Sequence, residues 1–154
     1  MSPVSKEQLD SLSERFFTEF RPASSQDLAI LKEQNWPESL VEFYSQHEPN
    51  ADPDEIPDIR FLSIQGIMFE SKEMDPSAAL VPLGYIPFAS TRFGDPFLFD
   101  MNSVGPDGHP PVVRASHEEF MGEVTKDFAE QNLKRIADSL ADFISKALTN
   151  ELEG

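Results

Sequence analysis

The sequence predicts an α+β protein with N-terminal helices, a central β-sheet that is mostly antiparallel or mixed, and C-terminal helices that pack on the sheet. Two observations support this fold class. Helical patterns occupy both ends of the chain, whereas short apolar runs bounded by Pro and Gly occupy the middle. Such long blocks of one type favour α+β over alternating βαβ units. A length of 154 residues with 39% apolar residues suits one domain, residues 1–154, with its own core.

The first helix is expected over residues 5–20. Ser5 and Gln8 form a capping-box pattern at its start. A stripe of large apolar residues then recurs at helical spacing, which is typical of a core-facing side: Leu9, Leu12, Phe16 and Phe20.

A second, shorter helix is expected over residues 25–34. Ser24 or Ser25 can cap it, because a short hydroxyl side chain accepts a hydrogen bond from a free N–H of the first turn. Asn35 suits a left-handed residue that closes this helix, a position where Asn is second to Gly.

A third helix is expected from Pro37 to about His47, since Pro suits the first helical position. Trp36 is then predicted to lie buried in the corner between the second and third helices. A buried indole covers up to about 250 Å², so its role is interpreted as structural. The residues assigned to this structural motif are Trp36, Pro37, Leu40, Phe43 and Tyr44.

The middle of the chain is expected to supply the sheet. Residues 65–77 read as a short helix or an irregular segment anchored by Met68, Phe69 and Met74. Gly94 and Asp95 lie where hairpin geometry wants them, and Asp100 ends the clearest strand. The expected strands are residues 59–64, residues 80–88 as an edge or bulged strand, residues 96–100 as a central strand, and residues 112–115.

The C-terminal part is expected to be helical. Residues 116–119 form a capping-box pattern, followed by Phe120, Val124 and Phe128 at helical spacing. Residues 132–138 fit a short strand or a continuation of that helix. Ser139 starts a last helix, whose apolar face is Leu140, Phe143, Ile144 and Leu148.

Composition excludes several classes of function. The chain has no Cys, so disulfides, thiolate zinc sites and Cys nucleophiles are absent. A net charge of −16 makes nucleic acid and anionic membranes poor partners and a basic protein a good one. No apolar run reaches the ~20 residues that span a bilayer, and the first residues lack a signal-peptide core. A cytoplasmic protein is therefore expected.

Catalytic and metal-binding patterns are weak. His47, His109 and His117 show no ligand spacing, so they are interpreted as structural or exposed, with no metal or other cofactor expected. Asp95 and Asp100 could form a carboxylate pair like that of a hydrolase, but their positions fit a turn and a strand end. No catalytic residue is assigned.

Acidic residues gather between positions 48 and 75, where the bases are Arg60 and Lys72. Residues 48–58 contain three Pro and five acids and are expected to form an exposed loop without regular structure. The cluster is either a solvated rim or a docking face that steers a basic partner. The expected docking residues are Glu48, Asp52, Asp54, Glu55, Asp58, Glu70, Glu73 and Asp75, with Phe69, Tyr85 and Phe93 as apolar hot spots.

Three segments in this order resemble the SUKH superfamily of Smi/Knr-like domains. They are Trp36 to Tyr44, the pair Gly94-Asp95 with the strand that follows it, and Ile136 to Ile144, within a motif-bearing region of about residues 24–148. The family usually has an Asn-Gly pair where this chain reads His47-Glu48-Pro49-Asn50, which leaves the conformation there open.

The resemblance implies a non-enzymatic protein-binding domain. Small stand-alone bacterial members resemble immunity proteins that neutralise polymorphic toxins, often nucleases, whereas fungal members resemble scaffolding regulators of cell-wall synthesis with long disordered flanks. The absence of such flanks here favours the immunity reading, with a basic toxin domain as partner. The regulatory or scaffolding module is the alternative. The sequence leaves the oligomeric state open.

Overall fold

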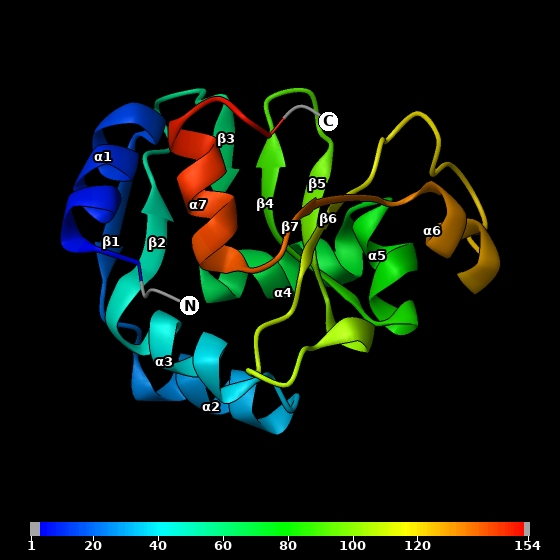
Figure 1. The fold of residues 1–154 in the computed structure, drawn as a ribbon, viewed down its shortest axis with the longest axis horizontal. Coiled ribbons are helices and arrows are strands. Elements are labelled where there is room, and N and C mark those ends of the chain that lie inside the picture. The colour runs from blue at the N-terminus through cyan, green and yellow to red at the C-terminus, as the bar shows by residue number, and fades with distance from the viewer. Residues whose placement is uncertain (1–3, 153–154) are drawn as a thin grey trace.

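The computed structural model describes residues 4–152 and has an α+β architecture, as predicted. Its centre is a five-stranded sheet in the order β3-β4-β5-β6-β7 (Figure 1). Every neighbouring pair of these strands is antiparallel, so the sheet is a simple meander. The strands are β3 (Ile59–Phe61), β4 (Tyr85–Thr91), β5 (Pro96–Asp100), β6 (Val112–Arg114) and β7 (Lys134–Ala137).

Helix α7 (Leu140–Leu148) packs on this sheet through Phe143, which contacts Phe88 and Phe97, whereas the N-terminal helices lie beside and below the sheet in Figure 1. Ser139 caps α7 by accepting a hydrogen bond from the Asp142 backbone N–H, as its sequence predicts. The helices are α1 (Lys6–Phe16), α2 (Ser25–Glu33), α3 (Glu38–His47), α4 (Ile64–Glu73), α5 (Ser77–Leu80), α6 (Lys126–Asn132) and α7 (Leu140–Leu148).

Strand β5 is buried on both faces, which confirms its predicted central place. Phe97 and Phe99 point into the main core, where the Phe97 ring lies 4.9 Å from that of Phe143 and the Phe99 ring stacks on Phe88 at 4.1 Å. Leu98 points the other way, into a second cluster that contains Tyr85. This alternation follows from the two-residue period of a strand.

The predicted helix over residues 5–20 is wrong at its end. Phe17 adopts φ 51°, a left-handed conformation, and its N–H bonds the Ser13 carbonyl, which closes α1. The chain then forms β1 (Thr18–Arg21), which pairs with β2 (Glu48–Ala51) in a separate two-stranded antiparallel sheet. The expected loop over residues 48–58 is therefore wrong at its start, because its first four residues are a strand.

The corner at Trp36 is confirmed. The Asn35 backbone has φ 59°, and the N–H groups of Asn35 and Trp36 bond the carbonyls of Lys32 and Leu31, both at 3.1 Å. This is the Schellman arrangement for ending a helix. The indole is 7% exposed, and its ring centre lies 5.7 Å from that of Tyr44 and 6.0 Å from that of Phe99. Pro37 takes the N-cap position rather than the first helical one.

Residues around β4 differ from the prediction. Residues 80–83 are helical, as the end of α5 and a 3-10 turn, and β4 lies inside the sheet rather than at its edge. A bulge between Pro87 and Ala89 accommodates the proline, as expected for an interrupted strand. Residues 65–77 belong mostly to a helix, α4, but Phe69 and Met74 are exposed and do not anchor it.

The predicted helix at residues 116–128 is wrong. Its first part is a turn followed by irregular backbone, and α6 begins at Lys126 after its cap, Thr125. Phe120 is buried all the same, with its ring 5.2 Å from that of Phe128, so the apolar spacing reflected burial and not a helix. The open question at residues 132–138 is resolved in favour of a strand, β7.

Candidate protein-binding surface

A rigid acidic turn follows β2. The Asp52 backbone N–H bonds the Phe17 carbonyl at 2.8 Å, and the Asp52 side chain accepts a hydrogen bond from the Asp54 N–H at 2.9 Å. The Arg60 guanidinium holds the Glu55 carbonyl at 2.9 Å. These bonds fix the backbone while the carboxylates stay in solvent, since Asp52, Asp54, Glu55 and Asp58 are all exposed.

The β4–β5 hairpin places a second exposed turn beside the first. Strand β3 pairs with β4, so Ile59 lies opposite Thr91, and the Arg92 N–H bonds the Asp58 carbonyl at 3.2 Å. Gly94 adopts φ +95° in this turn, a conformation that favours Gly. Both turns lie at the upper end of the sheet in Figure 1.

Two large apolar side chains project from these turns. Ile56 is 72% exposed and Phe93 is 77% exposed, although both could have been polar without harm to the core. An exposed apolar pair rimmed by charge is typical of an interaction site. We name this surface the acidic edge: Asp52, Asp54, Glu55, Ile56, Asp58 and Phe93.

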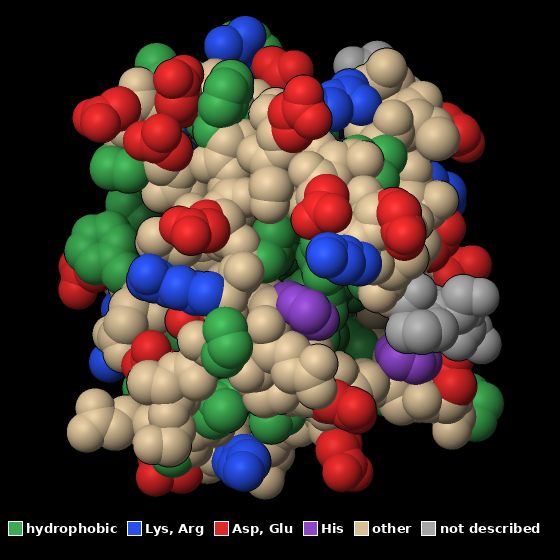
Figure 2. Space-filling view, turned by 90° about the vertical axis from the view of Figure 1, so that its left-hand side faces the viewer, with side chains coloured by type: hydrophobic (Ala, Val, Ile, Leu, Met, Phe, Trp, Pro, Cys, Tyr) green, Lys and Arg blue, Asp and Glu red, His purple; other side chains and the backbone are tan. Residues whose placement is uncertain are grey.

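Charge on the acidic edge is only partly compensated. Arg92 lies 3.5 Å from Asp58, but both side chains are well exposed, and such pairs contribute little. Acidic side chains are also spread over the face seen in Figure 2, with hydrophobic side chains exposed between them. The negative charge is therefore broad, and the acidic edge adds to it two of the most exposed large apolar side chains, Ile56 and Phe93.

Two of the expected docking residues are not accessible. Glu48 is buried, because it starts β2 and its carboxylate accepts a hydrogen bond from the Ile64 N–H at 2.9 Å. Tyr85 is 4% exposed, and its pKa is raised by burial and by the charges of Asp100 and Glu130, against a hydrogen bond from Asn102 that lowers it. Neither belongs to an exposed docking face.

The remaining expected docking residues form a separate surface on and just after α4. Phe69 is 59% exposed, and Glu73 and Asp75 are exposed as well. Glu70 is half-buried, and burial raises the pKa of its carboxyl. Figure 1 shows α4 at the end of the sheet opposite to the β4–β5 turn, so the single face expected from sequence is divided into two.

Asp95 is a buried structural anchor for the chain behind the β4–β5 turn. One carboxylate oxygen lies 2.8 Å from the Arg114 guanidinium, and the other accepts from the His117 N–H at 3.0 Å and lies 2.6 Å from the His117 ring nitrogen Nδ1. Burial alone would raise the pKa of Asp95, but these hydrogen bonds and the Arg114 charge bring it below its ordinary value.

Asp95 and Asp100 do not form a catalytic pair. They lie just before and at the end of β5, so five residues of strand place them about 17 Å apart. Paired carboxylates of glycoside hydrolases are about 5–9.5 Å apart. Asp100 instead caps the 3-10 turn that follows it, by accepting a hydrogen bond from the Asn102 N–H at 3.0 Å.

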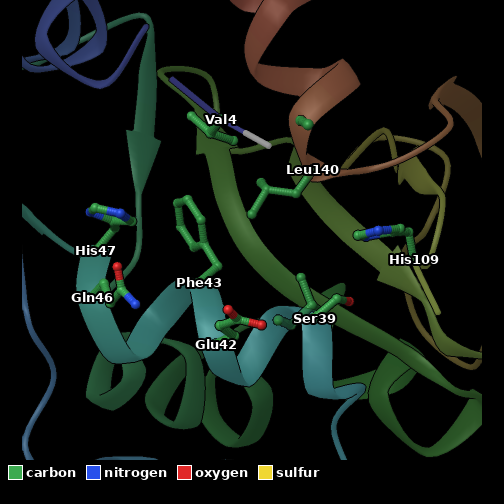
Figure 3. A pocket seen from close by; sticks show the side chains of 10 residues that line it. Val4, Ser39, Glu42, Phe43, Gln46, His47, His109 and Leu140 are labelled. Atoms are coloured by element: carbon green, nitrogen blue, oxygen red, sulfur yellow. The ribbon is translucent and has the colours of Figure 1, made fainter. Parts of the chain in front are cut away.

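His47 and His109 line a hollow of about 320 Å³ between α3, the loop before β6 and the start of α7. Figure 3 shows Phe43 rising from α3 into this hollow, with the two histidines on opposite sides of it. A zinc site needs three or four converging ligands. Within residues 4–152, no group of three or more His, Asp or Glu side chains is placed to hold a metal ion.

Sequence reasoning missed two features. Ile56 was not among the predicted docking residues, although its position carries a signal. A lone large aliphatic residue inside an acidic, Pro-rich run is expected to be exposed. Asp95 lies just before β5, whereas Arg114 and His117 lie at the end of β6 and just after it, and nothing in the sequence predicts that these two segments meet. Among the described helices, none has the length and hydropathy needed to cross a membrane.

Comparison with known proteins gives one family. A model of the SMI1 / KNR4 family (SUKH-1) matches residues 22–146, which is most of the chain. No curated protein matches. The matched region contains the Trp36 corner, the acidic edge and most of α7.

Proposed function

Since the chain belongs to the SMI1 / KNR4 family (SUKH-1), we propose that it is a non-enzymatic protein-binding domain that acts in the cytoplasm as an immunity protein. It neutralises a basic toxin by docking through the acidic edge. The observation that carries this proposal is the exposed pair Ile56 and Phe93 within a rim of four carboxylates. Family membership supports a role in protein interaction, and the acidic edge supports a basic partner.

The two parts of the acidic edge have different physical roles. Ile56 and Phe93 supply apolar area that becomes buried in a complex, where a few central side chains carry most of the affinity. The carboxylates steer the encounter and can raise association rates to about 10⁸–10⁹ M⁻¹s⁻¹ at low salt. A nuclease is the toxin class that fits best, because a cleft that holds phosphate is basic and an acidic surface mimics its substrate.

The test is binding and protection against the toxin, with two matched sets of variants. The first set replaces the four acids of the acidic edge by amides: Asp52→Asn, Asp54→Asn, Glu55→Gln and Asp58→Asn. The second removes the same charge from exposed acids outside it: Glu118→Gln, Glu119→Gln, Glu123→Gln and Glu130→Gln. The candidate partner is a basic protein recovered from the native cell at low salt and released at high salt.

The first set should slow association by about tenfold or more at low salt, whereas the second set should change it by about twofold, because distant charges are screened. Phe93→Ala should speed dissociation without changing the salt dependence. Cells that express the toxin should survive with the second set and die with the first. Equal binding by both sets would remove the acidic edge from the proposal.

A scaffolding module is the second candidate. The surface formed by Phe69, Glu73 and Asp75 lies at the opposite end of the sheet from the acidic edge, which would let one domain contact two proteins at once. A Phe69→Ala change should then release one cellular partner while a Phe93→Ala change releases another. A toxin gene beside the gene for this chain favours immunity, and its absence favours the scaffold.

A further inference from the structure

A hollow of about 510 Å³ beside the acidic edge is lined by three arginines. It lies where the C-terminal ends of α1 and α7 meet the β4–β5 turn, at the upper end of the sheet in Figure 1. The whole chain has 12 Lys and Arg residues against 28 acids, so this grouping runs against the overall charge. We name it the arginine hollow: Arg15, Arg92, Arg114, Phe16, Phe93 and Phe97.

The three guanidinium groups are held in place by bonds within the described part of the chain. Arg114 bonds Asp95 at 2.8 Å, and Arg15 bonds the Leu148 carbonyl at 3.0 Å as well as the Asn150 side chain. The Arg92 contacts are longer, at 3.5 Å to Asp58 and 3.4 Å to the Ile56 carbonyl. Each group uses one or two of its five donors in these bonds, which leaves donors to bind a ligand.

Apolar side chains form half of the lining, and the polar side chains besides the arginines are Asp58, Thr91 and Asn150, with Asp58 held by Arg92. Phe16 and Phe97 are buried in its wall, with the Arg15 guanidinium 5.2 Å from the centre of the Phe16 ring and that of Arg114 5.8 Å from the Phe97 ring. Phe93 contributes a largely exposed ring at its border. A small-ligand site typically has a volume of about 300–1,000 Å³, and the arginine hollow lies within this range and combines aromatic walls with charged groups.

We propose that the arginine hollow binds a carboxylate carried on an apolar stem. Guanidinium groups match the two oxygens of a carboxylate, and the phenyl rings match the stem. A polyanion such as nucleic acid is disfavoured, because the chain's net charge of −16 repels it. A single negative charge is repelled least and is attracted at short range. The carboxylate belongs to a free organic acid or to the C-terminus of a peptide that ends in an apolar residue.

This site does not depend on the proposed immunity function and is tested with the chain alone. The full chain, isotope-labelled for NMR, is titrated with 3-phenylpropionate and with its neutral amide, and then with a short peptide ending in Phe as the free acid and as the amide. The acids should shift the Arg92 side-chain signal and the Gly94 amide. The neutral forms should bind about tenfold more weakly, since they lose the charge-assisted hydrogen bonds.

Arg92→Gln should weaken binding of the acid about tenfold, while Arg60→Gln is the control. The Arg60→Gln change removes the same charge from the neighbouring strand β3, but Arg60 does not line the hollow. Tighter binding of the peptide than of the free acid assigns the site to a protein C-terminus, and the reverse assigns it to a small acid. Equal binding of acid and amide, equal loss in both variants, or no shift with any probe would overturn the proposal.

Discussion

Trp36 links two helices to the central sheet at the scale of one residue. Its backbone N–H closes α2 by donating a hydrogen bond to the Leu31 carbonyl, and its indole ring contacts Tyr44 on α3 and Phe99 on β5. Trp36→Ala should lower the free energy of unfolding by about 3–5 kcal/mol, as large buried aromatic truncations do. Trp36→Phe keeps part of the ring contact and should cost less. Urea denaturation measures both, and an equal loss in the two variants would contradict the edge-to-face contribution.

Asp95 gives the protein a defined dependence on pH. Its pKa lies below the ordinary value in the folded state, because the hydrogen bonds from His117 and Arg114 outweigh burial. A lowered pKa means that the ionised carboxylate stabilises the fold above the unfolded pKa of about 3.9. This stabilisation is lost as the pH falls through the lower, folded pKa.

Asp95→Asn should therefore lower the free energy of unfolding at neutral pH by about 1.5–3 kcal/mol, the value of hydrogen bonds to a charged group. The difference from the wild type should shrink as the pH falls below about 4. Urea titrations at several pH values measure this difference. A difference that stays constant down to low pH would mean that Asn disturbs packing rather than charge.

Glu48 connects elements rather than neighbouring residues. It lies at the start of β2, and its buried carboxylate accepts from the N–H of Ile64, the first residue of α4. A negative charge at a helix N-terminus is stabilising. Burial raises the pKa of Tyr44 well above its ordinary value, and the nearby charge of Glu48 adds to this. The buried carboxylate therefore joins β2 to α4.

Glu48→Ala should lower the free energy of unfolding by about 1–3 kcal/mol, because it leaves the Ile64 N–H buried without a partner. Glu48→Gln keeps an acceptor and should lose less than half of this amount. Hydrogen exchange of the α4 amides, alongside urea denaturation, separates local loosening from global loss. Faster exchange confined to another helix would contradict the role of Glu48 in holding the N-terminus of α4.

The sequence predicted those elements whose signals are local. α3, α7 and the β4–β5 turn carry caps, turn residues and periodicity within a few residues of one another. The pairing of β1 with β2 was not predictable in this way, because a short strand is stabilised by a partner about thirty residues away. The helix predicted over residues 116–128 was wrong for the opposite reason: the apolar spacing is helical, but the backbone of residues 116–125 is irregular and α6 begins only at Lys126.

The candidate site, too, was predictable only where its signals are local in the sequence. Acidity and exposure of Asp52, Asp54, Glu55 and Asp58 follow from a polar, Pro-rich run. Their proximity to Phe93 depends on the pairing of β3 with β4, which no spacing in the sequence encodes. The arginine hollow forms only where α1, the β4–β5 turn, β6 and the end of α7 meet, and no local signal in the sequence predicts it.

Net charge acts at the scale of the whole molecule. A charge of −16 on 154 residues places carboxylates within range of one another over most of the surface, and their repulsion opposes the compact state. The pairs Arg92–Asp58, Arg135–Asp138 and Lys146–Asp142 are exposed or partly exposed on both sides, whereas the Asp95 side of the Arg114–Asp95 pair is buried. Exposed pairs contribute too little to offset such a field.

Sodium chloride should therefore stabilise this protein. Raising its concentration from about 0.02 M to about 0.5 M shortens the screening length several-fold and weakens the repulsion. A gain of about 1 kcal/mol corresponds to a rise in Tm of about 2–4 °C for a chain of this size.

The control is the set Glu118→Gln, Glu119→Gln, Glu123→Gln and Glu130→Gln, which removes four negative charges from exposed positions and should show a smaller rise. Thermal unfolding by circular dichroism measures both. An equal rise in the two proteins would assign the effect to salt acting on apolar surface, and would show that the acidic charge leaves the fold unstrained.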